Sequence, residues 1–329
     1  MSIVGRLTAF RTQAILFGAV LAMAAAPARC EVRNPLGEGF EYDLGALRRV
    51  DPALVLFEEH DPVRVPLREP AGLAVDAAGR LIVVGDGRLV VLDRAGRELR
   101  SSQLAGDPTC VAADPDGTLF VGLRDRLQVL PGVDEGATPG LWESLGERAR
   151  VTGLAAGDDQ VWVADAGQRI VHTFSKSGKR GPVIGEAGSR DEPPHFIVPS
   201  PFFDVGIGPD ETLWVVNPGR HRVENYRADG TPVSSWGQAS MRVEGFCGCC
   251  NPSHLAVRRD GSFITSEKGL VRVKLYGPTG EFRGVVAPPD AFDEGTVGLD
   301  LAADADGDVL VLDAVRRQIR VFRQKVSKP

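Results

Sequence analysis

The residues best suited to chemistry lie in one short loop rich in cysteine. Three of the five cysteines, Cys247, Cys249 and Cys250, fall within four residues, and His254 follows four residues after the last of them. Thiolates together with an imidazole form a ligand set that suits copper, zinc or iron. We therefore predict a transition-metal centre at this loop, with Cys110 as a further candidate ligand from another part of the chain.

The N-terminal sequence predicts export, and export affects whether the cysteines are free or oxidised to disulfides. Arg6 and Arg11 accompany an apolar run over residues 14–26, and a small-x-small cleavage site ends at Ala28. This run of 13 residues is too short to span a bilayer comfortably and is typical of a signal peptide. The residues before Cys30 match a lipidation signal poorly. We expect cleavage near Ala28 and a periplasmic or secreted protein, with no transmembrane segment in the mature chain.

Export leaves two other interpretations of the cysteine loop open. Exported proteins usually oxidise their cysteines, so Cys247 and Cys250, or the adjacent Cys249 and Cys250, could form a disulfide that stiffens the loop. The same spacing also suits a catalytic redox pair. Since the cysteine count is odd, at least one thiol stays free or pairs outside the chain. Metal site, structural disulfide and redox pair all remain possible from the sequence.

The composition narrows the class of protein. The formal net charge is −6 and no block of lysine or arginine occurs, which disfavours a nucleic-acid-binding function. An acidic surface favours a soluble monomer. The 39 glycines and 23 prolines indicate many short elements joined by turns, which favours an all-β fold.

A pattern of strands and turns recurs six times along the chain. Each copy has an apolar strand, an Asp-x-x-Gly type of turn, a second apolar strand, a short turn and a third strand. Successive copies start 38 to 51 residues apart, which suits the four-stranded blades of a β-propeller. The copies begin at Gly72, Cys110, Gly153, Asp204, His254 and Asp300. We therefore predict an all-β, six-bladed β-propeller.

The ring also has to be closed. The last copy ends near Phe322 and leaves no room for a fourth strand. The apolar segment 53–57 lies upstream of the first copy and is otherwise unused. We expect this segment to be the outer strand of the last blade, which removes an open sheet edge. The predicted organisation is a signal peptide over 1–28, a leader over 29–38 and one propeller over 39–325.

The copies resemble NHL repeats. The third copy carries the clearest match, with Val163-Ala-Asp165 followed by Arg169. The cysteine loop over 245–254, followed by 265–269, is similar to a set of exported bacterial NHL proteins that carry a Cys-Gly-Cys-Cys-Asn-Pro loop. The resemblance implies a six-bladed propeller but no particular activity, since NHL propellers include enzymes, receptors and scaffolds.

The resemblance also implies where candidate residues gather. In such propellers, the loops that lead into the innermost strands and the loops between second and third strands open on one face. Besides the cysteine loop, the candidate metal ligands there are Asp204 and Asp300, which could instead hydrogen-bond a neighbouring loop. The candidate cofactor-binding residues on the same face are Asn217, Arg220, His221, Glu267 and Lys268. His221, Glu267 and Lys268 could also be ordinary turn residues.

Two classes of function follow from these residues. No nucleophile elbow, phosphate loop or dinucleotide fingerprint is present in the sequence. We therefore expect a binding module for a periplasmic protein or small ligand, rather than an enzyme, with a cysteine-rich face that holds a copper, zinc or iron ion. The alternative is a channel-metal hydrolase or lyase of the gluconolactonase-like or amidating-lyase-like type. Only His254, Asp204 and Asp300 occupy positions that such sites would need.

Overall fold

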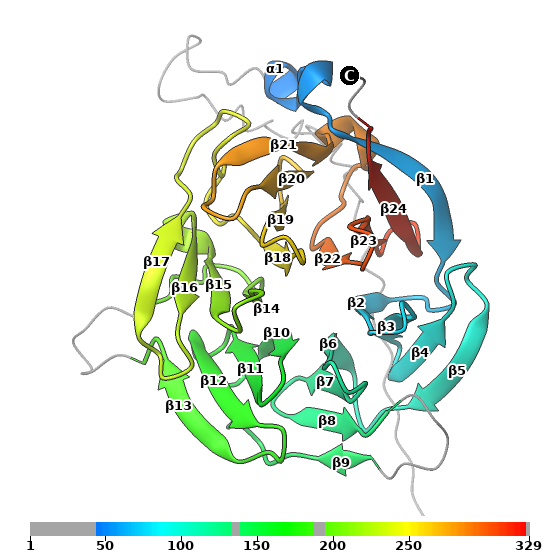
Figure 1. The fold of residues 1–329 in the computed structure, drawn as a ribbon, viewed down its shortest axis with the longest axis vertical. Helices are drawn as coiled ribbons and strands as arrows, with labels where there is room; N and C mark the ends of the chain where they lie inside the picture. The colour runs from blue at the N-terminus through cyan, green and yellow to red at the C-terminus, as the bar shows by residue number, and fades with distance from the viewer. Residues whose placement is uncertain (1–43, 133–138, 187–194, 327–329) are drawn as a thin grey trace, which may run out of the picture. The chain divides into compact units, whose positions relative to one another are not determined.

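The computed structural model describes residues 44–132, 139–186 and 195–326. Six antiparallel sheets of four strands each are arranged around a central channel (Figure 1). The predicted all-β, six-bladed propeller is therefore confirmed.

The blades follow one another along the chain, with the first strand of each nearest the channel (Figure 1). Blade one comprises β2 (Pro70–Val75), β3 (Leu81–Gly85), β4 (Arg88–Leu92) and β5 (Glu98–Gln103). Blade two comprises β6 (Pro108–Ala113), β7 (Leu119–Leu123), β8 (Leu127–Leu130) and β9 (Gly140–Leu141). Blade three comprises β10 (Val151–Ala156), β11 (Gln160–Asp165), β12 (Ile170–Ser175) and β13 (Arg180–Ile184).

The remaining blades complete the ring. Blade four comprises β14 (Val205–Ile207), β15 (Leu213–Asn217), β16 (Arg222–Tyr226) and β17 (Pro232–Trp236). Blade five comprises β18 (His254–Val257), β19 (Phe263–Glu267), β20 (Arg272–Tyr276) and β21 (Phe282–Ala287). Blade six comprises β22 (Asp300–Ala303), β23 (Val309–Asp313), β24 (Gln318–Gln324) and β1 (Phe57–Arg64). The helices are short: α1 (Leu44–Arg48) and 3₁₀ turns at Pro52–Leu54, Pro218–Arg220 and Pro289–Ala291.

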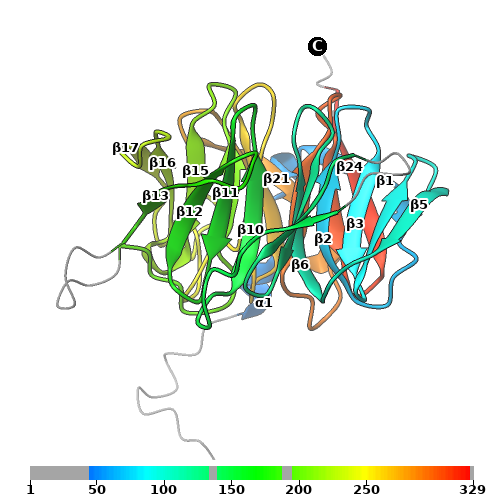
Figure 2. The same cartoon turned by 90° about the horizontal axis from the view of Figure 1, so that it is seen from below.

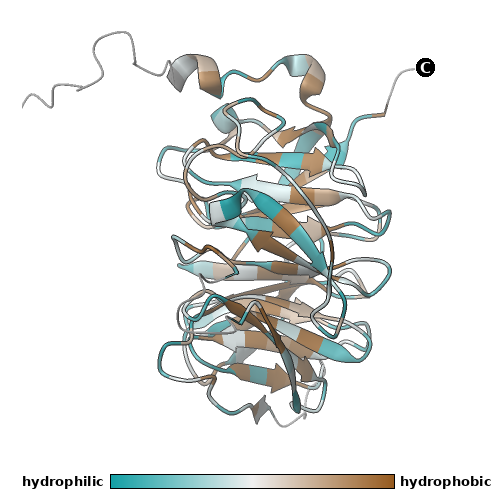
Figure 3. Ribbon diagram, turned by 90° about the vertical axis from the view of Figure 1, so that its left-hand side faces the viewer, coloured by the Kyte–Doolittle hydropathy of each residue, from teal (hydrophilic) through white to brown (hydrophobic). Residues whose placement is uncertain are grey.

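Apolar second strands and polar turns explain why the sequence folds this way. The strands β3, β7 and β23 are buried at every residue, because neighbouring blades cover both of their faces. Hydrophobic residues are accordingly concentrated in the strands (Figure 3). In the first Asp-x-x-Gly turn, the Asp76 carboxylate accepts the amides of Ala78 and Arg80, and Gly79 takes a φ of 77° that favours glycine. The recurrent aspartates and glycines are thus turn residues.

The N-terminal segment closes the ring, but not with the residues predicted from the sequence. Strand β1 pairs antiparallel with β24, from Phe57 opposite Gln324 to Arg64 opposite Gln318. The predicted strand over 53–57 was therefore placed too early. The reason is local: Pro52 starts a 3₁₀ turn, capped by the Asp51 carboxylate, that takes up the first part of this segment.

A buried arginine joins the closing strand to the last blade. The Arg320 side chain on β24 is 1% exposed and binds both oxygens of Glu59 on β1, at 2.7 and 2.6 Å. It also donates to the Ala291 carbonyl and lies 3.6 Å from Asp313. A two-point bond between guanidinium and carboxylate fixes geometry as well as adding energy.

The sequence predictions for the N-terminus lie outside the described residues. These are the signal peptide over 1–28, the leader over 29–38, the start of the propeller at 39 and the state of Cys30. Among the described residues, no helix is long and apolar enough to cross a membrane.

We predict that Glu59→Ala weakens the closed ring. Its loss would leave Arg320 buried with weaker partners, so the free energy of unfolding should fall by about 1–3 kcal/mol. Urea denaturation followed by tryptophan fluorescence measures this change. Glu58→Ala is the matched control, because Glu58 is the exposed neighbour on the same strand. Equal losses in both variants would contradict a specific role for the Arg320 contact.

Candidate functional site

Strand register places the candidate residues at one end of the blades. In blade three, Val151 at the start of β10 lies opposite Asp165 at the end of β11, which lies opposite Ile170 at the start of β12. Every blade repeats this pairing. The loops that lead into first strands and the hairpins between second and third strands therefore open on the same face (Figure 2). We call this the mouth face; the cysteine loop leads into β18 on it.

The cysteine loop presents a pair of adjacent thiols. The Sγ atoms of Cys249 and Cys250 lie 3.0 Å apart, with Cys249 exposed and Cys250 buried. All four described cysteines are free thiols, so the structure contains neither of the disulfides considered from the sequence. The loop therefore offers two neighbouring sulfurs, one of which reaches solvent.

The two thiols of this pair differ in acidity. Burial opposes ionisation of Cys250, but the positive charge of Lys268 and the interaction with the Cys249 thiol outweigh it and lower the pKa of Cys250. The hydrogen bond and the charge of Cys250 raise the pKa of Cys249. Cys250 is thus the first of the pair to become a thiolate, which is the nucleophilic and metal-binding form.

An asparagine ties the cysteine loop to the hairpin that carries Lys268. The Asn251 side chain donates to the carbonyls of Cys247 and Lys268, at 2.7 and 3.0 Å, and accepts the Lys268 amide at 2.9 Å. From blade four, the His221 ring contacts the Gly248 carbonyl at 2.7 Å. These bonds hold the loop against two hairpins, so the thiol pair and Lys268 keep a defined relative position.

Cys247 belongs to a different environment from the thiol pair. Its thiol donates to the Glu267 carboxylate at 3.3 Å, inside a buried cluster with Arg272 and Lys274. Burial and the negative charge of Glu267 raise the pKa of Cys247 to about 11. Burial lowers the pKa of Lys274 to about 8. Glu267, a candidate cofactor-binding residue, is 1% exposed and pairs with these cations.

The central channel carries the remaining candidate metal ligands. Cys110, Asp204, His254 and Asp300 line a cavity of about 60 Å³. The Asp204 carboxylate accepts the amides of Val205 and Leu255, at 2.8 and 3.0 Å. Asp204 therefore hydrogen-bonds the backbone of the neighbouring blade five, which is the structural role considered as the alternative to metal binding.

Asp300 repeats this arrangement at the junction of blades six and one. Its carboxylate accepts the amides of Leu73 and Leu301, at 2.7 and 2.8 Å. Burial raises the pKa of Asp300 to about 6, and burial together with the charge of Asp300 raises the pKa of Asp204 well above its usual value. Burial also lowers the pKa of His254 to about 4. The narrow channel thus favours the neutral form of each group.

An aromatic residue that the sequence did not single out connects the channel to the thiol pair. The Phe202 ring lies 5.6 Å from the His254 ring, at 70°. The Lys268 ammonium lies 5.6 Å from the centre of the same ring. Lys268 thus lies over Phe202, which in turn contacts His254, and its positive charge also acts on Cys250, so these residues connect the mouth with the channel.

The structure divides the predicted metal ligands into three groups. Cys249 and Cys250 form one group, Cys247 lies with Glu267, and the channel residues form the third. Among the described residues, no three His, Cys, Asp or Glu side chains are arranged to hold one metal ion. The adjacent thiols are the two soft donors that lie closest together among these groups, and one of them, Cys249, is exposed.

The blade-four candidates support the loop that leads into that blade. Asn217 is fully buried, accepts the Ile197 amide and donates to Glu224 at 3.0 Å. Arg220 donates to the His195 carbonyl at 3.1 Å. The sequence did not reveal that the His195 ring contacts Glu224 at 2.9 Å, because these residues come from different elements.

Comparison with solved structures shows the same architecture in several enzymes. A streptogramin B lyase superposes with a TM-score of 0.57 at 11% identity, over 84% of this chain and all (100%) of that chain. A virginiamycin B lyase from Staphylococcus aureus gives 0.56 at 10% identity, over 82% and 100%. A gluconolactonase from Xanthomonas campestris gives 0.56 at 15% identity, over 82% and 99%. At these identities the likeness shows the fold alone. No family model and no curated protein matches the sequence.

We predict that Lys268→Gln makes Cys250 less reactive. Without the ammonium, the pKa of Cys250 should rise, so alkylation by iodoacetamide at pH 7 should slow several-fold. Fragment mass spectrometry after timed alkylation distinguishes Cys250 from Cys249. Lys268→Arg should restore the rate, and Lys179→Gln, an exposed lysine of blade three, should leave it unchanged. An unchanged rate in Lys268→Gln would show that Lys268 does not stabilise the thiolate.

We predict a pH-dependent contribution of Asp300 to stability. Its folded pKa lies above its unfolded value, so its contribution is present below about pH 4 and is lost as the pH rises towards 6. In Asp300→Asn this loss is absent. The difference in unfolding free energy between wild type and variant should therefore fall by about 1–3 kcal/mol from pH 4 to pH 6.5. Chemical denaturation at each pH measures it, and exposed Asp290→Asn should show no such trend.

Proposed function

We propose that this chain is an exported binding module of the NHL propeller type, which takes up a soft transition-metal ion at the mouth of its channel. The observation that carries the proposal is the pair of adjacent thiols, with Sγ atoms 3.0 Å apart and one of them exposed. The export, the periplasmic location and the relation to NHL proteins rest on the sequence patterns described above.

The number of sulfurs favours a cuprous ion over zinc or an iron–sulfur cluster. Structural zinc sites almost always use four protein ligands, and iron–sulfur clusters are usually held by four. Cys249 and Cys250 supply only two, and no larger cluster occurs among the described residues. Thiolates select cuprous ions, which tolerate low coordination numbers. Because Cys249 is exposed, its side chain can rotate to open the pair around an ion.

The open side of the pair also suits exchange with a partner. A metal held by two sulfurs at a surface leaves room for a ligand from a second molecule. The hydrogen bonds of Asn251 keep the loop in place while the exposed side remains accessible. We therefore propose a periplasmic protein or small thiol compound as the source or recipient of the ion.

A channel hydrolase or lyase is the second candidate. The observation in its favour is the carboxyl pair of the channel with raised pKa, Asp204 and Asp300. Both line the same cavity as the neutral His254, in a fold shared with a gluconolactonase and two lyases. The cavity they line measures about 60 Å³, which holds water or an ion, whereas ligand pockets usually measure ~300–1,000 Å³. Both carboxylates are also engaged by backbone amides. Binding at the mouth is therefore the stronger proposal.

We predict that the reduced full chain binds about one cuprous ion through the thiol pair. Anaerobic titration against a chromogenic cuprous chelator measures the affinity. Cys249→Ser or Cys250→Ser should weaken it by about 100-fold or more, since losing even an outer partner of a metal site costs ~10–100-fold.

Cys110→Ser is the matched control, because this buried thiol lies in the channel and outside the loop. It should leave the affinity unchanged. Absence of competitive binding by the wild type, or equal binding by the Cys250→Ser variant, would refute the metal-binding function. Metal content by mass spectrometry after periplasmic expression then identifies the ion that is acquired in the cell.

A further inference from the structure

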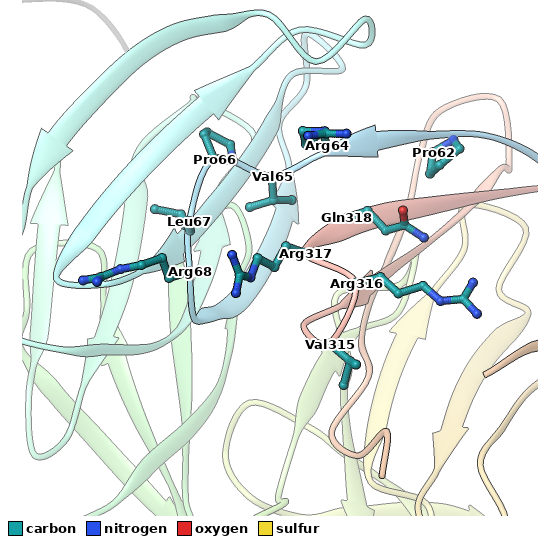
Figure 4. A pocket seen from close by; sticks show the side chains of 10 residues that line it. All are labelled: Pro62, Arg64, Val65, Pro66, Leu67, Arg68, Val315, Arg316, Arg317 and Gln318. Atoms are coloured by element: carbon teal, nitrogen blue, oxygen red, sulfur yellow. The ribbon is translucent and has the colours of Figure 1, made fainter. Parts of the chain in front are cut away.

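A second site lies on the mouth face, where the closing strand joins blade one. A cavity of about 630 Å³ lies between two segments that are far apart in the sequence. One segment runs from the end of β1 into β2, over Pro62–Arg68; the other is the β23–β24 hairpin, over Val315–Gln318 (Figure 4). The volume falls in the range of small-molecule pockets, ~300–1,000 Å³.

Four of the ten residues that line this cavity are arginines, and none is acidic. Arg316 is paired with Asp293 at 2.7 and 2.8 Å. Within the described parts of the chain, the side chains of Arg64, Arg68 and Arg317 make no hydrogen bond and no ion pair. The Asp86 carboxylate accepts the amides of Arg68 and Glu69, and these bonds, together with the charge of Arg68, lower the pKa of Asp86. Three guanidinium groups of the cavity thus have no carboxylate bonded to them within the described residues.

The segment that carries Arg64 and Arg68 is anchored in the hydrophobic core. Val65 and Leu67 are buried, and prolines stand at positions 62 and 66. The Val65 amide donates to the Arg317 carbonyl at 2.9 Å, which fixes the two segments to each other. The arginines therefore project from a rigid frame, so an anion does not have to order the backbone in order to bind.

We propose that this cavity binds a multivalent oxyanion, an organic compound with phosphate or carboxylate groups. The planar guanidinium group matches both groups through paired N–H bonds. Arg64, Arg68 and Arg317 are exposed, so an anion can reach them, and its charge would be attracted to these cations. Arg64 and Arg317 come from opposite segments, so a ligand with two anionic groups would bridge them. The site is independent of the thiol pair and of its proposed metal.

Such a ligand would also stabilise the closed ring. Arg64 ends β1, and Arg317 precedes β24, the strand with which β1 pairs. An anion held by both arginines would clamp the closing strand to its partner. Since the site exists only in the folded ring, binding should raise the midpoint of thermal unfolding.

Calorimetric titration of the full chain with tripolyphosphate, and separately with citrate, tests the proposal at constant ionic strength. We expect saturable binding of at least one probe and a higher unfolding midpoint in its presence. The probe that binds more tightly distinguishes phosphate from carboxylate recognition. Arg64→Gln combined with Arg317→Gln should weaken binding at least tenfold and abolish the shift in the midpoint.

Arg259→Gln is the control, because Arg259 is exposed and lies in the turn between β18 and β19, at the other end of the blades. It should bind like the wild type. If the double variant does not fold, Arg68→Gln tests the same pocket through a third arginine and should also weaken binding. Absence of saturable binding, or equal weakening by Arg259→Gln, would overturn the proposal.

Discussion

A ring of antiparallel sheets leaves two open edges unless strands from both ends of the chain are paired. Here β1 meets β24, and polar contacts reinforce the same seam. The Asp300 carboxylate in blade six accepts the Leu73 amide in blade one, and Arg94 pairs with Asp304 at 2.7 Å across the two blades. The positions of the thiol pair and of the arginine pocket both depend on this closure. In an open ring the blades could move relative to one another, and the hairpins of the mouth face would lose their fixed arrangement.

A repeated polar pair explains why some candidate residues are structural. In blades three to six, the last residue of the second strand interacts with the residue seven positions later on the third strand. The four pairs are Asp165 with His172, Asn217 with Glu224, Glu267 with Lys274, and Asp313 with Arg320. A buried polar group at one position requires a partner at the other, or it costs free energy. Asn217 and Glu267 are therefore engaged in these pairs within their own blades.

The sequence was sufficient for the fold because six copies share one spacing and one strand pattern. It was also sufficient to direct attention to the cysteine loop and to the face on which it lies. It could not give contacts between distant segments. The contacts of Lys268 with Phe202 and of Phe202 with His254, and the cavity shared by Arg64 and Arg317, all depend on how loops and hairpins from different elements pack. The closing strand was displaced because a 3₁₀ turn at Pro52, rather than hydrophobicity, determines where β1 can begin.

The buried charges beneath the cysteine loop explain why Cys247 is directed inward while Cys249 is exposed. The Lys274 ammonium donates to the carbonyls of Val243 and Gly245 and lies 4.5 Å from the Phe246 ring centre. Buried ion pairs contribute little net stability, but breaking one is costly, so such a cluster specifies a position more than it strengthens a fold. By anchoring the start of the loop, with Cys247 turned inward to Glu267, it leaves Cys249 at the surface beside Cys250. A loop held only by exposed turns would not keep these two sulfurs in a fixed position at the mouth. The buried cluster of Glu267, Arg272 and Lys274 therefore helps to position the thiol pair.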